Sequence, residues 1–103
     1  RGIFASHYMQ LNREATAEDL SRLYQDCYGS DFFIRWVLEC PNVNSVRHSN
    51  FVDIGAATEN GFLIVWSVLD NLQKGAAGQA VQNMNVMCDF PEETGLRSAP
   101  VLP

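Results

Sequence analysis

The apolar run from Phe62 to Leu69 constrains the fold of this 103-residue chain more than any other segment. It follows Asn60-Gly61, a dipeptide that strongly indicates a tight hairpin because both residues tolerate positive φ. The run is apolar at odd and even positions alike, whereas a half-buried strand alternates. We therefore expect a central strand in a sheet covered on both faces, preceded across the turn by a strand over 51–58.

Two further segments, Ile3 to Leu11 and Phe32 to Leu38, are rich in strand-forming residues. Between them, Thr16-Ala17-Glu18-Asp19 resembles a capping box, and apolar residues then recur at helical spacing as far as Gly29. This pattern predicts one amphipathic helix. The loop over 39–50, with Pro41 and three asparagines, separates the second and third strands.

A second helix is expected to begin between Asn71 and Gly75, to run to about Cys88 and to end before Pro91. Its predicted apolar stripe consists of Ala77, Val81, Met84 and Cys88. The resulting order, β-α-β-β-β-α, predicts an α+β fold, with a mostly antiparallel sheet of about four strands and one helix packed on it. Beyond Pro91 we expect a surface tail or a segment that wraps another domain.

Composition excludes several classes of function. The net charge of −5 and the pI of about 4.7 disfavour binding to nucleic acid or to an anionic membrane. Three cysteines and two histidines show neither C-x-x-C nor zinc-ligand spacing, so no metal site is expected. We expect inert, packed thiols in a reduced intracellular protein.

The segment from Asp70 to Asn85, DNLQKGAAGQAVQNMN, carries the strongest functional signal. It joins the apolar run to a helix whose first turns hold almost only small residues. Such residues allow close approach of the backbone, and the free N–H groups of a helix start favour anionic or polar ligands.

This segment resembles the C-terminal signature of the N-acetyl-γ-glutamyl-phosphate reductases, which are NADP-dependent enzymes of arginine biosynthesis. Further matches are Arg1-Gly2-Ile3, Ser49-Asn50 with Ile54-Gly55, and Pro91-Glu92-x-Thr94-Gly95-Leu96. Glyceraldehyde-3-phosphate and aspartate-semialdehyde dehydrogenases are similar in architecture. The resemblance implies that residues 1–70 form part of a substrate and dimerisation domain. It also implies that residues 71–103 form a helix and tail that belong to, or pack on, a missing dinucleotide-binding (Rossmann) domain.

The resemblance further implies a cysteine nucleophile and an acid–base histidine. Both are expected upstream of this chain, which lacks the family's Pro-Gly-Cys-Tyr and glycine-rich motifs, so no catalytic residue is assigned here and the isolated chain is expected to be inactive. Cys27, although followed by Tyr28, is assigned to helix packing. Implied partners are a small acyl phosphate and further copies of the chain, in the cytoplasm or, in a eukaryote, an organelle.

The resemblance suggests Asn71, Lys74 and Gly75 as cofactor-binding residues, with Asn71 facing the nicotinamide carboxamide. The structural alternatives are a turn or cap for Asn71, a solvated Lys74 and helix packing for Gly75. His48, Ser49 and Asn50 form a candidate loop on the substrate side, with a plain solvated loop as the alternative. The aromatic residues Phe32, Phe33 and Trp36 fit either an oligomer contact or the core.

Two other functions remain open at this point. One is a non-catalytic α+β module for binding or assembly. The other is a related dehydrogenase that acts on a different acyl phosphate, such as aspartyl phosphate. The length of the natural polypeptide and its substrate preference distinguish these alternatives from the reductase.

Overall fold

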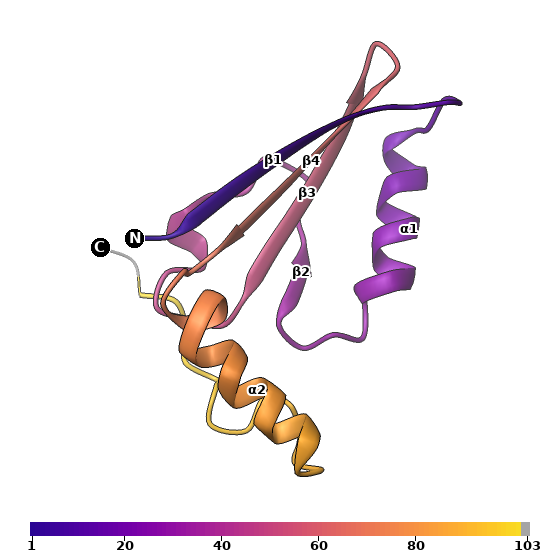
Figure 1. Ribbon diagram of the computed structural model, residues 1–103. Helices are drawn as coiled ribbons and strands as arrows, with labels where there is room; N and C mark the ends of the chain where they lie inside the picture. The colour runs from indigo at the N-terminus through magenta and orange to yellow at the C-terminus, as the bar shows by residue number, and fades with distance from the viewer. Residues whose placement is uncertain (102–103) are drawn as a thin grey trace.

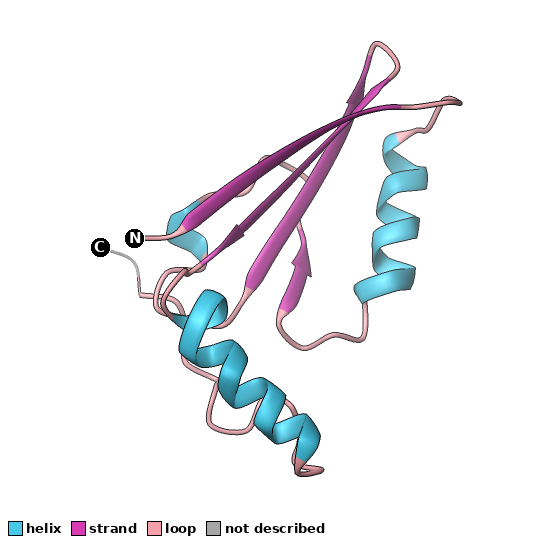
Figure 2. Ribbon diagram, viewed as in Figure 1, coloured by secondary structure: helices cyan, strands magenta, loops and turns pink. Residues whose placement is uncertain are grey.

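A computed structural model describes residues 1–101, in which strands and helices follow the predicted β-α-β-β-β-α order. The elements are β1 (Ile3–Gln10), α1 (Ala17–Tyr28), β2 (Ile34–Trp36), β3 (Val52–Glu59), β4 (Phe62–Leu69) and α2 (Gly78–Met87). A 3-10 turn, η1 (Val43–Ser45), and a π-helical turn, η2 (Gln73–Ala77), complete the described part. Figures 1 and 2 show α1 beside the sheet and α2 extending from one end of it. The α+β prediction is confirmed.

The four strands form one sheet in the order β1-β4-β3-β2. As predicted for an apolar run, β4 is central, and it is antiparallel to both β1 and β3. The hairpin is confirmed, with φ of 50° at Asn60 and 81° at Gly61. In contrast, β2 is parallel to β3 and shorter than the predicted 32–38, so the sheet is mixed. The long loop that follows β2 supplies the crossover that a parallel neighbour requires.

Helix α1 covers one face of the sheet over β2 and β3. Its start is the predicted capping box, in which the Asp19 N–H donates to Thr16 Oγ1 at 3.1 Å and the Thr16 N–H donates to Asp19 Oδ2 at 2.9 Å. Trp36 Nε1 donates to Ser21 Oγ at 3.1 Å. The sequence left open whether three aromatic residues lie in the core or in an oligomer contact. Trp36 packs under α1 and Phe33 is buried, whereas Phe32 is 43% exposed.

The opposite face is covered only at one end. There the loop after β2 lies against Gly55, where an added Cβ would lie 2.7 Å from the Glu39 carbonyl oxygen and 3.3 Å from Pro41. Away from that end, alternate residues of β1 and β4 point to this face, and the strand register places their side chains next to one another. We call the uncovered part the open apolar face; it consists of Phe4, Tyr8, Phe62, Ile64 and Trp66. Tyr8 is 70% exposed, so the predicted cover on both faces of the sheet is incomplete.

Helix α2 departs from prediction in the side that it buries. Its buried residues are Gly78 and Asn85, whereas Met84 and Cys88 of the predicted apolar stripe are exposed. The exposed apolar side chains around this helix are Leu72, Met84, Val86, Met87 and Phe90. Helix α2 therefore uses small and polar groups for its internal contacts and leaves its apolar side without cover in the described chain. No helix within residues 1–101 has the length and hydropathy to cross a membrane.

The segment after α2 folds back on the helix. Asn85 Nδ2 donates to the carbonyl oxygens of Glu92 and Thr94, each at 3.0 Å, and Leu96 is buried. Residues 92–96 of the predicted surface tail therefore contact α2 and the 46–50 loop, while most of the described tail is exposed, as predicted. The three cysteines, Cys27, Cys40 and Cys88, are free and exposed, which corrects the expectation that they are packing residues.

Candidate functional site

The candidate site lies where β4 ends and η2 begins, and its centre is Asp70. This carboxylate is fully buried. Oδ1 accepts from the N–H groups of Leu72 at 2.8 Å and Gln73 at 3.0 Å, which caps the start of η2. Oδ2 accepts from the His48 N–H at 2.6 Å and from Arg1 Nε at 2.8 Å. One side chain thereby joins Arg1, which precedes β1, to the 46–50 loop and η2.

These donors also determine the ionisation of Asp70. Burial alone would raise the pKa of its carboxyl group, because desolvation penalises the charged form. The hydrogen bonds from the His48 N–H, the Arg1 guanidinium and the two amides of η2 outweigh that penalty and hold the pKa well below the usual value. Asp70 is therefore a structural anion, and it has no proton to exchange near neutral pH.

Asn71 is fastened to the start of β1. Its Oδ1 accepts from the Gly2 N–H at 2.8 Å, and the side chain is half-buried. Gly2 has a φ of 128°, a conformation that favours glycine. The Asn71 Nδ2 donates to no protein acceptor within residues 1–101, so this amide has a hydrogen-bond donor to offer.

Lys74 and Gly75 lie side by side in η2 but differ in their surroundings. The Lys74 ammonium donates to Gln82 Oε1 and lies 5.2 Å from the centroid of the Phe33 ring. Burial lowers the pKa of Lys74, while the nearby carboxylates of Glu92 and Asp31 raise it by a smaller amount. Gly75 is exposed, and its N–H donates to the Asp70 carbonyl oxygen at 2.9 Å. η2 thus presents a small, accessible residue beside a cation that is turned toward the protein.

The loop over 48–50 contacts the same junction from the other side. His48 has a φ of 63°, which is uncommon for a side chain larger than glycine, and its N–H reaches Asp70. Ser49 is fully buried, with its hydroxyl donating to the Val46 carbonyl oxygen at 2.7 Å. Asn50 is also buried, and Nδ2 donates to the Leu96 carbonyl oxygen at 3.1 Å. Only His48 of these three retains appreciable exposure.

The structure thus brings the predicted residues Asn71, Lys74 and Gly75 close to the predicted loop. Sequence reasoning assigned no role at the site to Asp70 and Arg1, which connect these residues. The signal for Asp70 was available, because an aspartate directly after a strand and three residues before a helical turn is well placed to accept from the first amides of that turn. Its partners Arg1 and His48 could not be found, since they lie 69 and 22 residues away.

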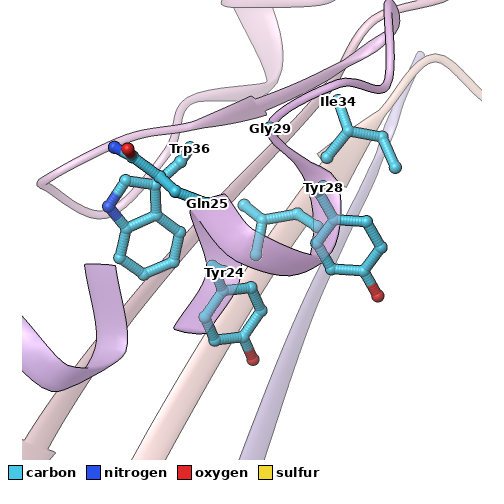
Figure 3. A pocket seen from close by; sticks show the side chains of 7 residues that line it. Tyr24, Gln25, Tyr28, Gly29, Ile34 and Trp36 are labelled. Atoms are coloured by element: carbon cyan, nitrogen blue, oxygen red, sulfur yellow. The ribbon is translucent and has the colours of Figure 1, made fainter. Parts of the chain in front are cut away.

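A separate hollow lies between α1 and the sheet, lined by Tyr24, Gln25, Tyr28, Gly29, Ile34, Trp36 and Ile54. Figure 3 shows its aromatic wall, in which the rings of Tyr24 and Trp36 stack with centroids 4.8 Å apart. It holds no acid–base pair. Within residues 1–101 there is also no group of histidine, cysteine and carboxylate side chains that could hold a metal ion.

One known protein family matches the greater part of this chain. Residues 1–71 match the family described as semialdehyde dehydrogenase, dimerisation domain. The chain belongs to this family. The dimerisation domain matched here thus comprises the whole sheet and α1 and ends at the Asp70–Asn71 junction.

Curated relatives match this chain over 97% to 100% of its length. One from Streptococcus sanguinis, named N-acetyl-gamma-glutamyl-phosphate reductase, is 49% identical over 102 residues, covering 97% of this chain and 30% of the relative. One of the same name from Archaeoglobus fulgidus is 45% identical over 103 residues, covering 100% of this chain and 31% of the relative. The chain therefore spans about three tenths of the length of the relatives it matches.

A solved structure shares the fold of the dimerisation domain. It is the crystal structure of aspartate semialdehyde dehydrogenase II complexed with ASA from Vibrio cholerae, with a TM-score of 0.66 and 21% sequence identity. The match covers 85% of this chain and 27% of that chain. At this identity the match shows the fold alone.

Proposed function

We propose that this chain is the dimerisation and cofactor-facing part of an NADP-dependent N-acetyl-γ-glutamyl-phosphate reductase, acting in arginine biosynthesis. The observation that carries this proposal is the match to reductases of that name over 97% to 100% of the chain. In the intact enzyme, the acyl phosphate is reduced to the semialdehyde. The nucleophile and the acid–base group are assigned to the rest of the polypeptide, and no catalytic residue is placed in this chain.

The junction at Asp70 fits one end of a nicotinamide cofactor, which supplies hydride when bound. The Asn71 Nδ2, which has no acceptor within residues 1–101, is suited to a carboxamide oxygen, and the Asn71 Oδ1 is held in place by the Gly2 N–H. Gly75 is exposed beside Asn71, and its lack of a side chain lets η2 pack against the end of β4, because an added Cβ would lie 3.1 Å from Leu69 Cδ1. The accessible group at this position is therefore the Gly75 backbone. Lys74 fits less well, because its ammonium already contacts Gln82 and Phe33. We therefore assign Asn71 and Gly75 to cofactor contact and keep Lys74 as the weaker member.

The loop over 48–50 is proposed to lie on the substrate side of the same junction. His48 is its accessible member, and its imidazole could meet a polar group of the acyl phosphate. Ser49 and Asn50 are buried and contact protein groups, so we expect them to support the loop from within.

Two exposed apolar surfaces support the proposal that this chain is part of a larger assembly. The open apolar face is proposed to contact a second copy of the chain, because burying such a face is the ordinary role of a sheet in a dimerisation domain. The uncovered apolar side of α2, including Met87 at 83% exposure, is proposed to pack on the missing nucleotide-binding domain. Residues 1–70 and 71–103 would then serve different neighbours.

The decisive experiment uses the full-length polypeptide that contains this chain. We expect it to oxidise NADPH with N-acetyl-γ-glutamyl phosphate and to prefer NADPH to NADH. Equal or faster turnover with β-aspartyl phosphate would instead indicate a related dehydrogenase. A purified, folded protein that reduces neither substrate would indicate a non-catalytic module.

The role of Asn71 is tested with Asn71→Asp. This variant keeps the oxygen that accepts from Gly2 but removes the free amide donor. We expect KM for NADPH to rise about tenfold, the effect of one lost hydrogen bond to a buried polar group, with little change in the melting temperature. Asn83→Asp is the matched control, because it adds the same charge on α2 while keeping the oxygen that accepts from Gln79. Similar KM values in the two variants would contradict the role of Asn71.

A further inference from the structure

The side chain of Asn50 contacts two different parts of the chain, the C-terminal tail and the start of α2. Its Nδ2 donates to the Leu96 carbonyl oxygen at 3.1 Å. Its Oδ1 is buried and accepts from no N–H or O–H group within residues 1–101. This oxygen lies instead against Gly78, where an added Cβ would be only 1.7 Å from it. The Gly78 Cα–H groups are thus its neighbours, and such groups are weak donors.

Gly78 is the residue at which η2 ends and α2 begins. Its N–H closes the π-helical turn by donating to the Gln73 carbonyl oxygen. The other end of the turn is fixed by Asp70, which in turn accepts from the His48 N–H. The 46–50 loop therefore holds η2 at both ends, through His48 at its start and through Asn50 at its end.

We infer that Asn50 is a positioning residue for cofactor binding: its buried amide, pressed against Gly78, sets where η2 and its neighbour Asn71 lie relative to the sheet. This inference rests on the proposed function, in which Asn71 and Gly75 contact the cofactor. Asn50 itself is buried and touches no ligand. A shorter side chain without the amide would leave the Leu96 carbonyl unpaired and open a gap beneath Gly78, so η2 would lose its fixed position.

Asn85 provides a matched control within the same chain. It is also a fully buried asparagine, and it also holds the C-terminal tail, through Glu92 and Thr94. Unlike Asn50, it is not the side chain pressed against Gly78. Asn85→Ala should therefore loosen the tail as Asn50→Ala does, and it should leave η2 in place.

The first measurement is hydrogen exchange of the full-length protein without cofactor. We expect Asn50→Ala to speed exchange about tenfold in peptides that cover residues 73–78, the effect of losing one buried contact. Asn85→Ala should speed exchange in residues 91–96 only. Equal effects of the two variants on residues 73–78 would overturn the inference, because Asn50 would then act only by holding the tail.

The second measurement is NADPH binding by titration calorimetry. Asn50→Ala should raise Kd about tenfold, and Asn85→Ala by less than about twofold. If the unmodified protein binds no NADPH, the proposed function fails; if it binds and Asn50→Ala binds equally well, only the role of Asn50 fails. Should Asn50→Ala not fold, Asn50→Leu replaces it, because it keeps a side chain of similar shape against Gly78, adds no buried charge and loses the donor to Leu96. That variant should disturb residues 94–96 more than residues 73–78, and the reverse order would overturn the inference.

Discussion

Replacing Asp70 by asparagine is expected to release the 46–50 loop from the end of β4. The substitution preserves the shape of the side chain but leaves one oxygen in place of two. The remaining oxygen can serve either Leu72 and Gln73 or His48 and Arg1. We expect it to stay with the two amides of η2, because Arg1, whose side chain is 26% exposed, can turn to water. The His48 N–H then faces an NH₂ group.

The magnitude follows from the contacts that are lost. A buried donor without an acceptor costs about 1–3 kcal/mol, and a hydrogen bond to a charged group contributes a similar amount. The left-handed conformation of His48 is strained in both proteins, so it does not add to the difference between them. We expect local destabilisation of about 1–3 kcal/mol, which corresponds to opening of the loop that is about five-fold to 150-fold more frequent.

Hydrogen exchange resolved near single residues is the appropriate assay. The His48 amide should show the largest increase, and the Leu72 and Gln73 amides should show smaller ones. Asp53→Asn is the control: Asp53 is equally buried and pairs with Arg35 at 2.6 Å, but it does not contact the loop amide. Unchanged exchange at His48, or a larger increase at Leu72 than at His48, would refute the reasoning.

The contribution of Asp70 to stability is also expected to depend on pH. Because the folded-state pKa of Asp70 is lowered, its contribution to stability is complete above the unfolded pKa of about 3.9 and is lost as the pH falls toward the folded value. Protection of the His48 amide, corrected for intrinsic exchange, should therefore weaken below about pH 5 in the unmodified protein. In Asp70→Asn this decline should be missing.

Three further substitutions test other parts of the structure. Thr16→Ala removes the acceptor for the Asp19 N–H and should lower the free energy of unfolding by about 1 kcal/mol in a urea titration; a change near zero would show that the capping box contributes nothing. Gly78→Ala places a methyl group 1.7 Å from Asn50 Oδ1 and 2.6 Å from the Gln73 carbonyl oxygen, so it should lower the melting temperature and accelerate exchange across η2; a protein as stable as the unmodified one would contradict the close packing. Lys74→Met should change the free energy of unfolding by less than about 1 kcal/mol, because the relief of a desolvated charge offsets its lost contacts, and any rise in KM for NADPH in that variant would show a role in cofactor binding.

The features that could be predicted from the sequence depend on residues that lie close together along the chain. Asn60-Gly61 specifies its turn locally, and Thr16 and Asp19 satisfy each other within one helical turn. The central position of β4 was also predictable, because an apolar run must be covered by neighbours. These patterns place most of the elements and the α+β class.

The remaining features depend on partners far along the chain. Nothing near Ile34 indicates that β2 pairs in parallel with β3, and the actual strand is shorter than its apolar pattern. The spacing of Met84 and Cys88 predicted a buried stripe, but Gly78 and Asn85 are buried instead. The exposure of Cys27 likewise follows from the limited area of sheet that α1 covers. In each case tertiary contacts decide the outcome, and local pattern alone does not contain them.

For the candidate site, the sequence indicated the right segment and left its connections unknown. Asn71 and Gly75 are close together simply because they are near neighbours in the chain. That His48 meets Asp70, and that Asn50 meets Gly78, follows from a loop that crosses the end of the sheet. The π-helical form of residues 73–77 was not predicted either, and the residues that contact its two ends, Asp70 and Asn50, lie outside it.

The pairing of β1 with β4 has a consequence for synthesis of the protein. Arg1 and Asp70, which close this pair at one end, are separated by 69 residues. Ribosomes add roughly 5–20 residues per second, so β1 waits several seconds before its partner strand exists. During that interval β1 lacks β4, the strand with which it pairs, and unpaired strands are prone to aggregate. The order of the strands thus makes the nascent chain, rather than the finished fold, the stage at which this segment most needs a chaperone.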